Sequence, residues 1–275
     1  MSSGDGKTGR VQLQRLLNGE PIDRTLRGEI WPLPDGGTAD EIVAVAKTMQ
    51  ADYCFFDRVP GVVGKAHALG LAAGAIVNGP WQRWMVEVGW QEAMLQLAKE
   101  SDLLRQGLAS AARQAEQEIE AWLDAGVDLV LLDIAYAAGP YMSPQQLERF
   151  LLPLYQAVVA RGTLTGVSVG FHSDGCVDLL LPGLRQANFR FYSLEPEGTD
   201  PIRAWNILGT RIPLFSGLPA NWLTPSGFFP NREGETLHAW LSSGPLVVSS
   251  ACGLYHAEAA ASLRDIYQWL DRNNK

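Results

Sequence analysis

The chain has 275 residues, of which 47% are hydrophobic and 19% charged, a balance typical of globular proteins and not of disordered ones. Its formal net charge of -8, without a cluster of Lys and Arg, argues against nucleic acid as a partner, because phosphate binding needs concentrated positive charge. No apolar run reaches the roughly 20 residues that span a bilayer, and the opening MSSGDGKTGR is not a secretory signal. With only three cysteines, the composition predicts a cytoplasmic protein without membrane contact.

The predicted elements begin with a helix over residues 10–18, which precedes a series of short β-rich runs. The predicted strands are residues 28–31, 52–57, 74–79, 128–133, 167–172, 189–195, 212–218 and 245–252. Helical patterns separate most of them, at residues 38–50, 101–125, 143–161, 200–208 and 232–243. The long helix starts at a Ser-Asp cap and stops at Gly126, and the next starts at Ser143-Pro144.

Apolar strands that alternate with helices indicate a parallel sheet covered on both faces. Eight such units in a chain of this length predict a (β/α)8 TIM barrel with a short N-terminal helical extension, one domain over residues 1–275. A doubly wound open sheet is the alternative, but no glycine-rich phosphate turn follows the first strands.

Polar side chains stand at the ends of six predicted strands. They are Asp57, Asn78, Asp133, His172 with Asp174, Glu195 and Cys252. Barrel enzymes build their sites at the carboxyl ends of the strands, so we expect these side chains to surround one pocket. A single strand-end Asp is also a common turn or helix cap, and it is the repetition around the barrel that favours a site.

One imidazole, two carboxylates and one thiol in this ring form a plausible tetrahedral zinc set. The predicted ligands are His172, Asp174, Glu195 and Cys252. The His-x-Asp spacing places two ligands just past one strand, where a loop can turn both toward one point. The alternative is a hydrogen-bonded core histidine at position 172 without any metal.

The order of several motifs resembles the uroporphyrinogen decarboxylase superfamily. They are GVDLVLLDIAYAAGPYMSPQQLERFLLP, FHSDG, YSLEPEG and SSACGL, with LLNGEPIDR and GPWQRWMVEVGW nearer the N-terminus. More narrowly, the chain looks like the branch that contains methylcobamide:thiol (coenzyme M-type) methyltransferases. The resemblance spans nearly the whole chain and implies a TIM barrel.

In that branch a His-x-Cys pair and a distant Cys bind zinc, which activates a thiol to take a methyl group from a corrinoid protein. The resemblance implies that His172 and Cys252 are ligands, with Glu195 as the exchangeable fourth and Asp174 in place of the first Cys. Alternatively, the metal has been lost, or Cys176 substitutes for Asp174 by a shift of the loop. Asp57, Asp133 and Glu195 are then the catalytic candidates. The implied partners are a methylcobalamin-carrying corrinoid protein and a small-molecule thiol or other methyl acceptor.

Two alternatives remain at this level. The first is a metal-free decarboxylase of the uroporphyrinogen type, in which Asp57 of FFDRV would carry the proton relay, although RGEIWPLPDGG lacks that branch's Arg-rich segment. The second is a non-catalytic corrinoid-binding relative. Trp81, Trp84 and Trp90 either wall the barrel mouth against a corrin ring or pack on the barrel's outside.

Overall fold

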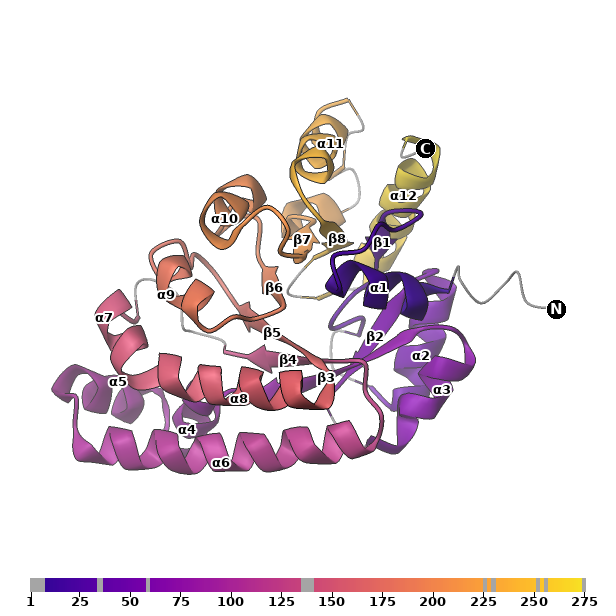
Figure 1. The fold of residues 1–275 in the computed structure, drawn as a ribbon. Coiled ribbons are helices and arrows are strands. Elements are labelled where there is room, and N and C mark those ends of the chain that lie inside the picture. The colour runs from indigo at the N-terminus through magenta and orange to yellow at the C-terminus, as the bar shows by residue number, and fades with distance from the viewer. Residues whose placement is uncertain are drawn as a thin grey trace.

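A computed structural model of the chain describes residues 8–33, 37–57, 60–134, 141–224, 227–228, 231–250, 253–254 and 257–273. Its strands form a single 8-stranded parallel sheet in the order β1-β8-β7-β6-β5-β4-β3-β2. Helices surround this sheet, which curves into a nearly closed barrel (Figure 1). The predicted (β/α)8 architecture and its N-terminal helix are therefore confirmed.

The strands lie close to their predicted positions, with one exception. They are β1 Leu26–Arg27, β2 Tyr53–Phe56, β3 Ala72–Asn78, β4 Leu129–Asp133, β5 Ser168–Ser173, β6 Phe191–Leu194, β7 Leu214–Gly217 and β8 Leu246–Ser249. The prediction of a first strand at 28–31 was wrong. The chain leaves the sheet at Gly28, where the ring of Tyr53 lies so close that an added Cβ would approach it to 2.9 Å.

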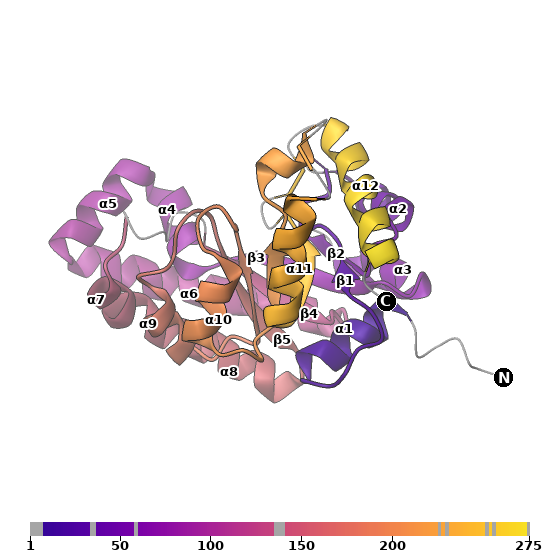
Figure 2. The same cartoon turned by 90° about the horizontal axis from the view of Figure 1, so that it is seen from above.

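The helices include several that the sequence patterns did not identify. They are α1 Gly9–Leu17, α2 Ala39–Thr48, α3 Val63–Ala68, α4 Pro80–Val88, α5 Trp90–Lys99, α6 Asp102–Asp124, α7 Pro144–Gln146, α8 Leu152–Thr165, α9 Leu181–Gln186, α10 Pro201–Leu208, α11 Glu233–Ser243 and α12 Ala257–Asn273. A π-helical turn at Leu147–Leu151 joins α7 to α8, and short 3-10 helices occupy Pro60–Val62 and Ala220–Leu223. In Figures 1 and 2, α4 and α5 lie at the opposite end of the molecule from α2, α3 and α12.

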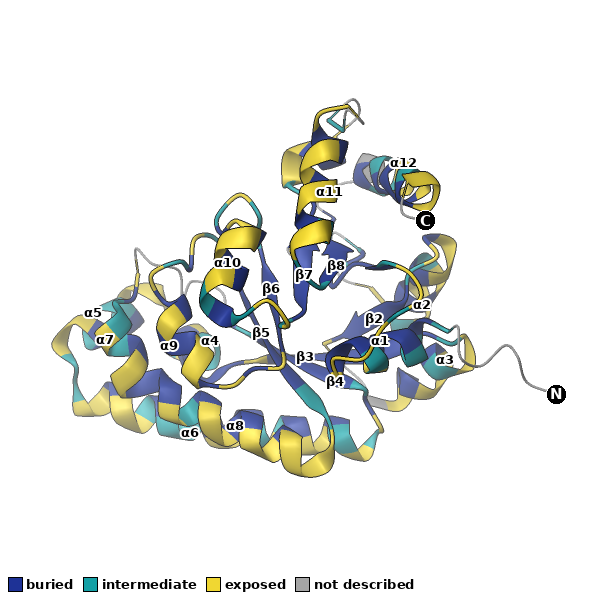
Figure 3. Cartoon of the chain, turned by 45° about the horizontal axis from the view of Figure 1, so that its top comes forward, coloured by how far each residue is buried: buried dark blue, intermediate teal, exposed yellow. Residues whose placement is uncertain are grey.

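The core has two layers, because successive side chains of a strand point to opposite faces. One cluster fills the barrel and includes Tyr53, Phe55, Leu131, Phe191 and Phe215. The other lies between the strands and the helices. Figure 3 shows the corresponding pattern on the helices, whose buried sides face the strands and whose exposed sides face outward.

The amino-terminal end of the barrel is closed by α1. Leu13 and Leu16 of this helix belong to the cluster that fills the barrel. The polar side of α1 is bound to the segment that leads into β4. Arg10 and Gln14 both donate to one carboxylate oxygen of Asp128, directly before β4. The opposite, carboxyl-terminal end is thus the open end. Within the described ranges, no helix has the length and apolar character needed to cross a membrane.

Candidate functional site

The polar strand ends predicted from the sequence lie at one rim of the barrel. The parallel register pairs Asn78 with Asp133, Asp133 with His172, and His172 with Ser193. Alternation along β4 puts Asp133 on the same side as Leu131, which is part of the cluster inside the barrel. The structure therefore places these side chains at one level across four neighbouring strands, facing the barrel axis.

His172 is the most enclosed group of this rim, with a side chain that is 2% exposed. Its Nδ1 lies 3.0 Å from the hydroxyl oxygen of Ser193, and its Nε2 lies 3.3 Å from Oδ1 of Asp174. The ring of Trp31 packs edge-on against the imidazole, with centroids 4.8 Å apart. The ring is thus fixed on three sides, and the half-exposed Asp174 is its neighbour toward solvent.

The loop after β5 is held in place by the loop after β6. The backbone N–H of Gly175 donates to the Glu195 carboxylate, and the N–H of Val177 donates to the Thr199 hydroxyl. Gly175 has a φ of 70°, in the left-handed region that favours glycine. Gly198 lies so close to it that a Cβ at Gly198 would approach the Gly175 carbonyl to 2.3 Å. Glu195 therefore helps to position Asp174, because it binds the backbone of the adjacent Gly175.

Asp57 lies across the barrel mouth, at the end of β2. It lines a small cleft together with Ile30, Trp31, Pro32, Leu33, Gly37, Ile42, Phe55 and Ile76. Trp31 connects this cleft to the rim, because the same ring contacts His172. Trp31 thus lies between the cleft of Asp57 and the imidazole of His172.

Cys252, the predicted sulfur ligand, lies outside the described residues. Among the residues that the structure does describe, no group of three or more His, Cys, Asp or Glu side chains is arranged to hold a metal ion. His172 and Asp174 are adjacent, while the interaction of Glu195 given above is with the Gly175 backbone. Cys252, which would complete the predicted set, belongs to the segment after β8.

The segment after β8 is anchored by a residue that the sequence analysis missed. Glu29 is fully buried and accepts hydrogen bonds from the backbone N–H of Ser250 (3.2 Å) and from the Ser250 hydroxyl. The Ser250 hydroxyl oxygen in turn accepts from the N–H of Gly253, at 2.8 Å. Burial raises the pKa of Glu29 from 4.5 to about 7, against the opposing effect of the Ser250 hydrogen bonds.

Ser193 and Trp31 were also missed, although the sequence held a signal for the first. A serine two residues after Phe191 in FRFYSLE falls on the inward face of β6, where an apolar residue is expected. Trp31 follows the first strand, whose position was itself predicted incorrectly.

Cys54, Cys176 and the three tryptophans considered for the barrel mouth differ in exposure. Cys54 is buried, and burial raises the pKa of its thiol to about 12, as in an unreactive core cysteine. Cys176 is exposed. Trp81 and Trp84 are 0% and 2% exposed in the layer between strands and helices, so their proposed place at the barrel mouth was wrong and the packing alternative is correct. Trp90 is 37% exposed and packs edge-on against Tyr141.

Comparison with known proteins found a distant relative in sequence and similar solved structures. The chain is 24% identical over 215 residues to the methylcobamide:CoM methyltransferase MtaA of Methanosarcina barkeri, a match covering 76% of this chain. The sequence is therefore distantly homologous to this methyltransferase. The matched region spans 59% of the length of that relative. No protein-family model matches the chain.

Solved structures support the same fold. A methyltransferase from Methanosarcina mazei superposes with a TM-score of 0.80 at 15% identity, over 96% of this chain and 98% of that one. The 3-keto-D-glucoside 4-epimerase of E. coli superposes with a TM-score of 0.54 at 13% identity, over 91% and 100% of the two chains. The resemblance predicted from the motifs is therefore confirmed at the level of the fold and of distant sequence homology.

Proposed function

We propose that the protein is a zinc-dependent methyltransferase that moves a methyl group from a corrinoid protein to a thiol. The observation that carries the proposal is the His172–Asp174 pair at the open end of the barrel, fixed from behind by Ser193. Distant homology to a methylcobamide:CoM methyltransferase supports the reaction type and the nature of the donor. The proposed ligands are His172, Asp174 and Cys252, with Glu195 as the exchangeable fourth.

The described part of this donor set fits zinc. The Nε2 and Oδ1 atoms are 3.3 Å apart, close to the separation of two ligands on a tetrahedral ion with bonds of about 2.0 Å. The same distance is long for a hydrogen bond, which is typically about 2.7–3.2 Å. The Ser193 hydroxyl meets the other ring nitrogen, as second-shell partners of metal-binding histidines do. Aspartate in place of a thiolate makes the set harder and its metal affinity lower.

Zinc bound at this position would lower the pKa of a coordinated thiol so that it reacts as the thiolate near neutral pH. Ser193 would accept the Nδ1 proton of His172 and so keep the Nε2 lone pair directed toward Asp174. Glu195 would hold the loop of Asp174 through Gly175. Asp57 and Asp133 would orient the acceptor at the mouth, and Trp31 would exclude water from the imidazole.

The transfer itself forms one bond and breaks one. The sulfur of the acceptor attacks the methyl carbon and forms the S–C bond while the cobalt–carbon bond breaks. The electron pair of that bond stays on the corrinoid, and the proton of the thiol has already been released to solvent. No other oxidant or reductant is needed.

Metal content of the purified full chain tests the proposal. We expect about one tightly bound zinc per chain in the wild type, and its loss in His172→Ala and Cys252→Ala. His238, which is exposed on α11, provides a matched control: His238→Ala should retain the metal. Cys176→Ala should also retain it if Cys252 is the sulfur ligand. Zinc that binds equally to His172→Ala and the wild type would contradict the assignment.

Activity is then measured with free methylcobalamin and a series of small thiols. We expect demethylation that depends on the thiol, reduced by about 10- to 100-fold in Ser193→Ala and more in His172→Ala. A zinc-loaded wild type that never demethylates methylcobalamin with any thiol would reject the proposed reaction while leaving the metal site intact.

A further inference from the structure

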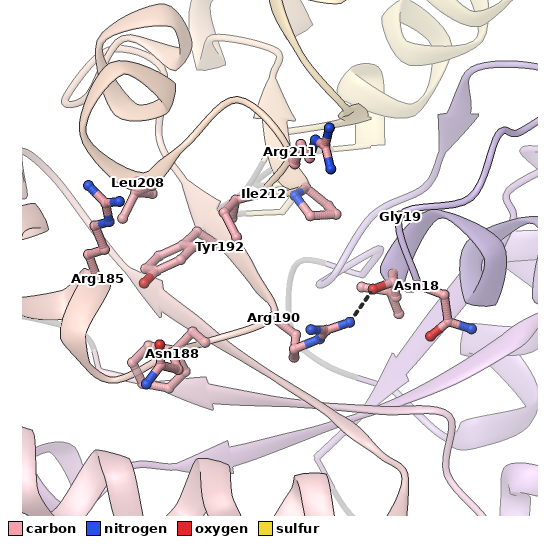
Figure 4. Close-up of a pocket in the computed structure, with 12 residues that line it drawn as sticks. Asn18, Gly19, Arg185, Asn188, Arg190, Tyr192, Leu208, Arg211 and Ile212 are labelled. Atoms are coloured by element: carbon pink, nitrogen blue, oxygen red, sulfur yellow. Dashed lines mark hydrogen bonds between the residues drawn. The ribbon is translucent and has the colours of Figure 1, made fainter.

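A second cavity lies at the other end of the barrel, away from His172. It has a volume of about 450 Å³ and is lined by Leu17, Asn18, Gly19, Arg185, Asn188, Phe189, Arg190, Tyr192, Leu208, Arg211, Ile212 and Pro213 (Figure 4). These residues come from the carboxyl-terminal ends of α1, α9 and α10, from β6, and from the connections that lead into β6 and β7. Connections that lead from helices into strands lie at the amino-terminal end of a barrel, whereas His172 is at the carboxyl-terminal end.

The cavity carries positive charge that no carboxylate among its lining residues neutralises. Arg190 donates to the backbone carbonyl of Leu17 (2.8 Å), and Arg185 donates to that of Ile207 (3.1 Å). Arg211 makes no hydrogen bond or ion pair to any residue that the structure describes. Glu20, beside the cavity in sequence, lies near Arg15 instead. In a chain with a net charge of -8, such a concentration of arginine is a local exception.

Several other arginines of the chain are paired with carboxylates. Arg10 meets Asp128, Arg24 meets Asp52, and Arg161 meets Glu120. In the cavity, by contrast, the acceptors of Arg185 and Arg190 are neutral backbone carbonyl groups. Their guanidinium forks therefore retain their charge and most of their donors.

The rest of the lining is largely apolar. Phe189 and Tyr192 are buried, and Leu208, Ile212 and Pro213 complete this wall. The Tyr192 hydroxyl donates to the Leu184 carbonyl, so that its polar end is satisfied within the protein. Figure 4 shows Arg185, Arg190 and Arg211 around Tyr192. Burial raises the pKa of Tyr192, and the charge of nearby Arg185 opposes that effect.

We propose that this cavity binds a phosphorylated small molecule. Two or more phosphate charges would be held by the guanidinium groups, which match phosphate oxygens in pairs. A single carboxylate would leave most of the positive charge uncompensated. The body of the molecule would lie against the Tyr192 wall, and the volume is within the range of small-molecule sites. The site is independent of the proposed zinc chemistry at the other end of the barrel.

Calorimetry and thermal unfolding of the full chain test this, with pyrophosphate, ADP and adenosine as probes. Pyrophosphate and ADP should bind and raise the Tm, since a ligand that binds only the folded state stabilises it. ADP should bind more tightly because its planar base meets the apolar wall, and adenosine should not bind. Arg211→Ala should lower the affinity for pyrophosphate and for ADP at least about tenfold, and Arg211→Lys should lower it less. The double variant Arg185→Ala/Arg211→Ala should bind neither probe.

Control variants distinguish loss of binding at the cavity from an effect of overall charge and from misfolding. Arg161→Ala removes the same charge elsewhere and should leave binding unchanged, as should His172→Ala at the opposite end. A circular dichroism spectrum identifies any variant that fails to fold, in which case Arg211→Lys decides. Absence of pyrophosphate binding at about 1 mM, or unchanged binding by the double variant, would overturn the proposal. ADP that binds less tightly than pyrophosphate would overturn the role given to the Tyr192 wall.

Discussion

Glu29 shows how one buried carboxylate can join two parts of this barrel. It follows β1, and its hydrogen bonds come from neutral groups, the backbone and hydroxyl of Ser250 and the more distant hydroxyl of Tyr267 on α12. The carboxyl group is fully buried, which raises its pKa to about 7. The folded protein therefore favours the protonated, uncharged form of this side chain.

This pKa gives the stability of the protein a defined pH dependence. Because the folded-state pKa of Glu29 lies above its ordinary value of 4.5, the folded state binds the proton more tightly than the unfolded state. The stabilisation is fully present below about pH 4.5 and is lost as the pH rises through about 7, a change on the order of 3 kcal/mol. Glu29→Gln should remove this part of the pH dependence and be the more stable protein at pH 8.

Urea unfolding across this pH range measures the effect. Glu87→Gln, at an exposed position of α4, is the matched control and should keep the wild-type slope. If Glu29→Gln loses stability with pH as steeply as the wild type does, the carboxyl group is not the titrating group.

For single residues, the sequence predicts that His172 and Asp174 stand at a strand end, but not which side chains hold them there. His172 and Asp174 follow directly from the strand pattern and from their spacing. Glu29 could not be found in this way, because its burial depends on α12, which is far from it in sequence. Ser193 could be recognised as a partner only after the register had placed it opposite His172.

The helices α4 and α6 pack against each other on the outside of the barrel. Trp84 of α4 lies over Gly107 of α6, where an added Cβ would approach the indole Nε1 to 2.0 Å. The glycine thus permits a close approach that no other residue allows without movement. Trp81, Trp84, Met85 and Val88 have the i, i+3, i+4, i+7 spacing that marks a helix packed on one side, a signal present in the sequence.

Gly107→Ala should destabilise the protein. Alanine in place of a helical glycine normally stabilises by up to about 1 kcal/mol, but here overpacking against Trp84 should give a net loss of about 1–3 kcal/mol. The control is Gly64→Ala on α3, where a Cβ would meet nothing within 4 Å, and which should be neutral or stabilising. Chemical denaturation of both variants gives the comparison, and equal stabilities would contradict this account of the α4–α6 contact.

Seen as a whole, the barrel has two ends of different charge. The open end carries the carboxylates of Asp57, Asp133, Asp174 and Glu195, which suit a cation and disfavour a highly anionic substrate such as a porphyrinogen. The closed end carries the cavity of unneutralised arginines. The strand order and the alternation of side chains predicted the first arrangement. The second depends on how α1 meets the helix-to-strand connections, which the sequence patterns do not specify.

The integrity of the barrel rests on the junction of β1 and β2, which the sheet order leaves at its two edges. Asp52 lies at this junction and is 1% exposed. Its backbone N–H donates to the Arg27 carbonyl (2.8 Å), and its carboxylate accepts from the Arg27 N–H (2.9 Å) and the Arg24 guanidinium. One side chain thus links the first and second strands where the ladder of the sheet is interrupted.

Asp52→Ala should therefore lower the free energy of unfolding by about 2–3 kcal/mol, because it leaves a buried N–H and a guanidinium unsatisfied. Asp40→Ala, whose exposed carboxylate meets Lys65 on the surface, should change it by less than about 0.5 kcal/mol. Hydrogen exchange locates the effect, since the amides of β1 should lose protection before those of β4 and β5. Uniform loss of protection over all strands, or an Asp52→Ala protein as stable as the wild type, would show that the barrel is closed by other contacts.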